Sequence, residues 1–266
     1  MKIHIKNYLL IIIALIFLSD ILYGQEETDI PKVEIGIDER LGETIPDGIF
    51  LTDEYGQQVN VKSLITKPTV FSLVYFRCPS ICSPLLNGVS KVVDKVDLEP
   101  GKDYNLITIS FDPTEDYILA SGKKESYLNA LKVKIPNDSW RFLTGDSINT
   151  KKICDVLGFK FQKQGKDFAH GASIMMVSPE GKIARYLYGT DYLPFDFKMA
   201  VTEATEGKVV PSISKIVKMC FSFDPDGRKY VLNITRVAGG GMLLLLGAFV
   251  IILNFKKKKI KTNSEV

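Results

Sequence analysis

Residues 69–86 read TVFSLVYFRCPSICSPLL, and this stretch decides the fold class. Its first eight residues, 69–76, are nearly all apolar or β-branched, which is typical of a central strand covered on both faces. Residues 83–96 place apolar side chains at helical spacing. These apolar positions are Leu85, Leu86, Val89, Val92, Val93 and Val96. The stretch therefore predicts a buried strand that leads through a short loop with two cysteines into an amphipathic helix.

Strands and helices alternate on both sides of this stretch. The other expected strands are residues 49–52, 59–61, 104–111, 140–143, 159–162, 172–178 and 183–188. The other expected helices begin at Pro113 or Glu115, at Asp146 or Ser147, and at Phe195. A tight turn at residues 179–181 makes the last two strands antiparallel neighbours. The order predicts one α/β domain over residues 47–210, a three-layer sandwich with a mixed central sheet.

The N-terminus has the pattern of a secretory signal. Lys2 and Lys6 precede an apolar run over residues 8–18, and Gly24 is a small residue at the expected cleavage point. The run is short for a membrane span, which needs roughly 20 apolar residues. We expect a cleaved signal peptide over residues 1–24, with an uncleaved anchor as the alternative, followed by a linker over 25–46.

The C-terminus carries a second apolar segment. Residues 237–255, VAGGGMLLLLGAFVIILNF, hold no charge, and the tract KKKK follows directly. This pattern predicts a transmembrane helix with a cytoplasmic basic tail over residues 256–266. Residues 211–236 then form a membrane-proximal segment. Together the two ends predict a single-pass protein of the cytoplasmic membrane, with its globular domain on the periplasmic side.

Composition and charge narrow the classes of partner. The chain has 266 residues, of which 45% are hydrophobic and 24% charged, as in ordinary globular proteins. Its formal net charge of +3 depends on the lysines of the C-terminal tail. Without a basic patch elsewhere, we expect no nucleic-acid partner. The sequence leaves the oligomeric state undetermined.

Cys78 and Cys82 stand where the predicted central strand ends and a helix begins. A helix N-terminus stabilises thiolates, so we expect Cys82, in the first turn, to be affected most, with Arg77 adding positive charge. In an oxidising compartment such a pair forms a disulfide or a metal site; two ordinary buried thiols are the plain alternative. A disulfide across so small a loop stabilises little, which favours a pair kept for its chemistry.

His170 is the only imidazole in the predicted mature domain, since His4 lies in the signal segment. We expect it in a loop just before the strand at residues 172–178. Two thiolates and one imidazole form a soft trigonal set that suits Cu(I) and can hold Cu(II), whereas zinc usually takes a fourth ligand. Cys78, Cys82 and His170 are therefore the candidate copper ligands, and the two cysteines are also a candidate redox-active pair.

Several segments in this order resemble the Sco/SenC family of copper-binding thioredoxin-like proteins. They are Tyr75 to Cys82, Pro84 to Leu86, Ser110 to Pro113, Trp140 to Gly145, His170 with the following strand, and Ser178 to Lys182. The resemblance implies a thioredoxin-like fold and copper held by two cysteines and one histidine, here Cys78, Cys82 and His170. It also implies delivery of copper to the binuclear copper site of cytochrome c oxidase, or reduction of the cysteines of that site.

Two other functions stay open. The cysteine pair at a helix start also fits a thiol–disulfide oxidoreductase. Catalysts of that type, however, have two residues between their cysteines and a cis-proline before the opposing strand, and no proline occurs from Phe159 to Ser178. The third hypothesis is a redox or copper sensor that signals to partners.

For several other residues the sequence allows a structural interpretation as well as a functional one. Asp112 either lies near the cysteines or forms a turn. Met175 and Met176 are core residues or additional Cu(I) ligands. Cys154 is expected to be a buried thiol on an apolar helix face. Cys220 lies outside the main domain, and the sequence does not decide its partner.

Overall fold

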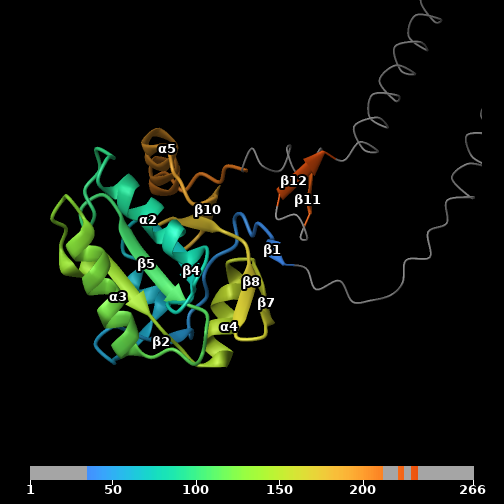
Figure 1. The fold of residues 1–266 in the computed structure, drawn as a ribbon. Helices are drawn as coiled ribbons and strands as arrows, with labels where there is room; N and C mark the ends of the chain where they lie inside the picture. Colours follow the sequence, from blue (N-terminus) through green and yellow to red (C-terminus); the bar gives the residue numbers. More distant parts are fainter. Residues whose placement is uncertain (1–34, 212–220, 225–228, 233–266) are drawn as a thin grey trace, which may run out of the picture. The chain divides into compact units, whose positions relative to one another are not determined.

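The computed structural model describes residues 35–211, 221–224 and 229–232. Its centre is a five-stranded mixed sheet with the strand order β10-β9-β4-β5-β6 (Figure 1). The strands are β4 (Thr69–Val74), β5 (Asn105–Ser110), β6 (Trp140–Leu143), β9 (Ser173–Val177) and β10 (Ile183–Tyr188). β4 pairs in parallel with β5 and antiparallel with β9, which confirms the predicted mixed sheet.

Two of the three inner strands, β4 and β9, are buried along their whole length. All six residues of β4 and all five of β9 are buried, so their sequences are continuous apolar runs rather than alternating ones. The few polar groups of the sheet interior are paired. The hydroxyls of Ser72 and Thr108 lie 2.8 Å apart, and the Trp140 indole N–H donates to Thr108 over 2.9 Å.

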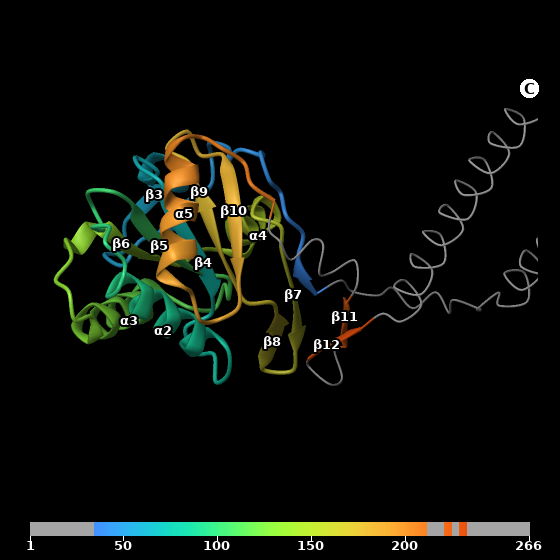
Figure 2. The same ribbon diagram turned by 90° about the horizontal axis from the view of Figure 1, so that it is seen from above.

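The helices connect and flank these strands. α2 (Cys82–Val93) joins β4 to β5, and α3 (Tyr117–Ala130) leads from β5 towards β6. The two lie side by side on one face of the sheet, as right-handed crossovers between parallel strands require (Figure 2). α4 (Ser147–Val156) contacts the strand Phe159–Gln164, which belongs to a second sheet. α5 (Pro194–Thr205) packs on β10 and β9. Short 3₁₀ helices span Val61–Leu64 and Asn137–Ser139.

A second, three-stranded sheet carries His170. Its order is β1 (Gly36–Ile37), β7 (Phe159–Gln164) and β8 (Asp167–His170). The expectation that His170 lies in a loop is wrong. His170 is the last residue of β8 and pairs with Phe161 of β7. Residues 165–166 form the turn, where Gly165 has a φ of +64°. A two-residue turn with glycine at its first position is a hairpin signal that the sequence does contain.

Residues 35–46, expected within the linker, form part of the folded domain. β1 pairs with β7, the Ile45 side chain is fully buried, and its N–H donates to the Gly181 carbonyl over 2.9 Å. The folded region therefore begins before residue 47. The predicted hairpin at residues 49–61 is present as β2 (Phe50–Thr52) and β3 (Gln58–Asn60).

The start of α3 also differs from the expectation. The helix begins at Tyr117 rather than at Pro113 or Glu115, because the Asp116 carboxylate caps it by accepting the Leu119 N–H. Residues 113–116 consequently lie outside the helix. α4 begins as expected, with Asp146 as its N-cap.

The predicted chain ends lie outside the described residues, including the signal at 1–24, the span at 237–255 and Cys220. Within the described ranges, no helix has the length and apolar character needed to cross a bilayer. A two-stranded sheet, β11 (Phe221–Asp224) with β12 (Lys229–Leu232), falls in the segment expected to be membrane-proximal.

Candidate metal centre

The end of β4 and the start of α2 position the two cysteines. After β4 the chain turns, and the Cys78 N–H donates to the Tyr75 carbonyl over 3.1 Å. Cys82 is the first residue of α2. The backbone N–H groups of Ser80 and Cys82 both donate to the Cys78 sulfur over 3.4 Å. The unpaired amides at the helix start therefore point at Cys78 rather than at Cys82.

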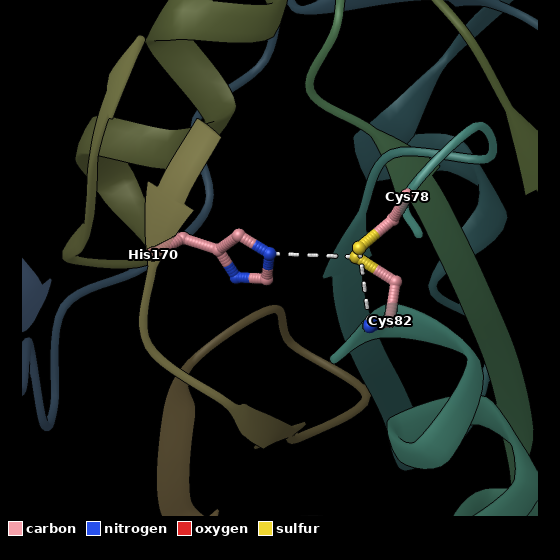
Figure 3. Close-up of side chains that lie close together, drawn as sticks. All are labelled: Cys78, Cys82 and His170. Atoms are coloured by element: carbon pink, nitrogen blue, oxygen red, sulfur yellow. Dashed lines mark hydrogen bonds between the residues drawn. The ribbon is translucent and has the colours of Figure 1, made fainter. Parts of the chain in front are cut away.

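β8 brings His170 to the cysteines from the second sheet (Figure 3). Its Nε2 lies 3.4 Å from the Cys82 sulfur, and its Nδ1 lies 2.8 Å from the Gly171 carbonyl. Since a carbonyl only accepts, this contact assigns the ring proton to Nδ1. The Nε2 lone pair then faces the sulfurs, which is the tautomer that a metal at this nitrogen needs.

The structure brings all three sequence-predicted residues together. One ligand atom each from Cys78, Cys82 and His170 lies within 4.8 Å of the others, and no second group of this kind occurs within the described ranges. Both cysteines are free thiols. Two sulfurs and one imidazole nitrogen match the preference of copper, and among the residues that the structure describes no fourth side chain of the kind that zinc sites use completes the set.

The two thiols differ in acidity, in the opposite sense to the expectation. Burial raises the pKa of Cys78, but hydrogen bonds from the N–H groups of Cys82 and Ser80 and from the Cys82 and Tyr75 side chains outweigh it and lower the pKa. Burial raises the pKa of Cys82 far above its usual range. Cys82, 3% exposed, lies too deep for the helix start to stabilise its thiolate.

An aromatic shell surrounds the imidazole. The rings of Tyr75, Phe111 and Phe159 have their centroids 6.0, 5.2 and 5.7 Å from that of His170. Burial in this shell lowers the pKa of His170, although the Gly171 carbonyl raises it in part. The shell therefore keeps the imidazole neutral, the form that binds a metal.

Glu115 is a buried residue beside the site that sequence reasoning treated only as a helix start. Its carboxylate accepts the N–H groups of Phe76 and Arg77, the two residues before Cys78, over 2.6 and 2.7 Å. It also accepts the Ser110 hydroxyl over 2.6 Å. The sequence signal is weak, since an acidic residue after Asp112-Pro113 is common at helix starts.

The other residues considered from sequence have structural roles. Asp112 forms a turn, in which its carboxylate accepts the N–H and hydroxyl of Thr114. Met175 and Met176 are buried in β9 and pair with Phe71 and Val70 near the start of β4, whereas the cysteines follow its end. Cys154 is a buried free thiol on α4, as predicted.

The chain is similar in sequence to a known protein family and to curated relatives. The family model described as SCO1/SenC matches residues 42–201. A curated relative from Bacillus subtilis (strain 168), named SCO1 protein homolog, is 26% identical over 145 residues, which cover 53% of this chain and 72% of the relative.

Solved structures share the fold. A candidate electron transfer protein from Aquifex aeolicus VF5 is 31% identical with a TM-score of 0.57, covering 63% of this chain and 95% of that one. Arabidopsis thaliana ScoI, solved with copper bound, is 21% identical with a TM-score of 0.50, covering 59% and 96%. These likenesses confirm the thioredoxin-like fold with its mixed central sheet. The SCO1/SenC family model matches more than half of the residues of this chain, so the chain belongs to the SCO1/SenC family.

Proposed function

We propose that this protein is a copper metallochaperone that receives and passes on a copper ion at Cys78, Cys82 and His170. The observation that carries the proposal is the convergence of two thiol sulfurs and one imidazole nitrogen within 4.8 Å. Copper is the cargo best matched to this soft donor set. The copper bound to Arabidopsis thaliana ScoI, which shares the fold, supports the same metal.

The three ligands suit different parts of a transfer. Cys78 is partly exposed and has the lowered pKa, so it offers the first thiolate to an incoming ion or a recipient. Cys82 and the neutral His170 lie deeper and complete the set from α2 and β8. We propose that the recipient is a subunit of cytochrome c oxidase, whose binuclear copper centre is the target that the family resemblance implies.

The proposed location rests on the sequence pattern of the two chain ends. We propose a signal peptide over residues 1–24 and a single transmembrane helix over 237–255, which holds the domain on the periplasmic side of the cytoplasmic membrane. The uncharged apolar run and the lysine tract after it support this anchor. An oxidising compartment also fits a cysteine pair that alternates between metal-bound, reduced and disulfide forms.

A second candidate function is favoured by the unequal thiols. A low-pKa, accessible Cys78 beside a buried Cys82 is the arrangement of a dithiol reductant. In that reaction the Cys78 thiolate attacks a target disulfide and releases one target thiolate; Cys82 then forms the Cys78–Cys82 disulfide and releases the other. The described residues contain no cis peptide bond, however, and catalysts of this type have a cis-proline opposite their cysteines.

Copper titration of the reduced full-length protein tests the proposal. We expect one copper per chain. His170→Ala should weaken binding by more than about 100-fold, since even outer-shell partners of metal ligands cost about 10–100-fold. Met176→Leu, at a buried methionine that pairs with Val70 near the start of β4, should leave affinity unchanged. If His170→Ala bound copper as tightly as the wild type, the three-ligand site would be wrong.

A further inference from the structure

The carboxylate of Glu115 is a buried hydrogen-bond acceptor beside the backbone that leads into the cysteine loop. Glu115 is 4% exposed, and its oxygens accept three hydrogen bonds, from Phe76 N–H, Arg77 N–H and the Ser110 hydroxyl. In the part of the chain that the structure describes, no lysine or arginine forms an ion pair with it. Acceptance of backbone N–H groups by both oxygens is the arrangement of a carboxylate anion.

The backbone N–H groups of Phe76 and Arg77 have no acceptor within the sheet. The ladder of β4 ends at Val74, so the N–H groups of Phe76 and Arg77 lie beyond the last sheet pairing. A buried N–H without an acceptor is costly, and Glu115 supplies the acceptor for both. The carboxylate therefore fixes the backbone immediately before Cys78.

The position of Glu115 depends on how the neighbouring helix begins. Because Asp116 caps α3, residue 115 stays outside the helix and can turn towards the sheet. Ser110 ends β5, and Phe76 follows β4. Glu115 thus ties the two loops that leave adjacent parallel strands on the same edge of the sheet, where the cysteines lie.

We propose that Glu115 is a positioning residue of the copper site, which holds the backbone before Cys78 and whose buried negative charge favours Cu(II) over Cu(I). This inference rests on the proposed copper function. A nearby anion stabilises the ion with the larger positive charge, and water-excluded surroundings strengthen the effect. The charge lies close to the site, since Glu115 accepts the N–H of Arg77, the residue that directly precedes Cys78, over 2.7 Å.

Two substitutions separate position from charge. Glu115→Gln keeps the side-chain shape but removes the charge and replaces one acceptor oxygen with an NH₂ group, which faces an N–H donor. Glu115→Asp keeps the charge but is one methylene shorter. Asp116→Asn is the matched control, because it removes the adjacent, exposed carboxylate while asparagine still caps α3.

The readouts are backbone amide exchange at Phe76 and Arg77 in the copper-free protein, and the ratio of Cu(II) to Cu(I) affinity. We expect exchange at one or both amides to rise on the order of tenfold in Glu115→Gln and Glu115→Asp, the cost of about one hydrogen bond. The affinity ratio should shift towards Cu(I) by about tenfold in Glu115→Gln only. Asp116→Asn should match the wild type in both measurements.

Wild-type exchange at both amides in the glutamine and aspartate variants would overturn the positioning role. An unchanged affinity ratio in Glu115→Gln would overturn the role of the charge. If Glu115→Gln did not fold, the exchange in Glu115→Asp would still decide the positioning role. A wild-type protein that bound no copper would instead reject the proposed function, and the copper-free exchange would separate that failure from a failure at Glu115.

Discussion

The sulfur of Cys82 lies 3.4 Å from Nε2 of His170, although 88 positions separate the two residues in the chain. Cys82 opens a helix beside the five-stranded sheet, whereas His170 ends a strand of the three-stranded sheet. The site is therefore complete only when both sheets are folded against each other. A metal held there would bind the folded chain in preference to the unfolded one and stabilise it.

Alkylation should distinguish the two site thiols. In reduced, metal-free protein, Cys78 should react with iodoacetamide at least about tenfold faster than Cys82, because it is more exposed and has the lower pKa. The Cys78 rate should rise with pH and reach half its maximum below pH 9.0, the ordinary thiol value. Peptide mapping by mass spectrometry identifies the labelled residue, with buried Cys154 as the slow internal reference. Labelling of Cys82 first would contradict the assignment.

Two glycines within helices should respond oppositely to alanine. At Gly88 of α2, an added Cβ would lie 2.1 Å from the Thr190 carbonyl oxygen, so Gly88→Ala should destabilise the fold by about 1–3 kcal/mol. At Gly122 of α3 nothing lies within 4 Å of the added atom. Gly122→Ala should therefore stabilise the fold by about 0.5–1 kcal/mol. Urea unfolding measures both, and equal effects would contradict the close packing at Gly88.

The buried Lys124 should be needed for stability. It pairs with Glu54, which also binds Arg141, and side-chain exposure at Lys124 and Glu54 is only 5% and 1%. Lys124→Met should cost about 3–5 kcal/mol, because it leaves a buried carboxylate without one of its two cations. Lys123→Met, at the neighbouring and more exposed lysine of α3, should change stability by less than about 0.5 kcal/mol. A cost below 1 kcal/mol at Lys124 would show that Arg141 alone compensates Glu54.

Cys154 should make stability fall at alkaline pH. Burial, with a smaller effect of Asp155, raises the pKa of this thiol to about 12, whereas the unfolded chain has the ordinary value of 9.0. Above pH 9 the unfolded state loses the proton first, so stability decreases as pH rises towards the folded value. Between pH 8 and 10.5 the wild type should lose about 2 kcal/mol more than Cys154→Ala. Parallel pH slopes in urea unfolding would contradict a buried, protonated thiol.

The sequence predicts those parts of the fold that local pattern determines. β4 and α2 are recognisable because complete burial of β4 requires an unbroken apolar run and because α2 buries a single apolar face. β8 is missed because its four residues, DFAH, are all exposed or half-buried, so they show no clear alternation. Residues 35–46 are missed because their few apolar positions pack on segments distant in sequence.

The candidate site is predicted in identity but not in detail. Cys78, Cys82 and His170 are identified by residue type and spacing, yet the order of the two thiol pKa values depends on depth of burial, which spacing does not show. Glu115 shows the same limit. Its inward turn is set by the capping of α3 at the next residue and by donors from β4 and β5, which only the folded chain brings together.

The hairpin that presents His170 constrains how this chain can vary in length. Side chains alternate between the two faces of a strand, so one residue inserted or deleted within β8 would turn the imidazole away from the cysteines. Residues added at the tip, around Gly165, would extend the hairpin and leave the pairing of His170 with Phe161 intact. We therefore expect insertions to be tolerated at the tip of this hairpin, while its base must keep its register.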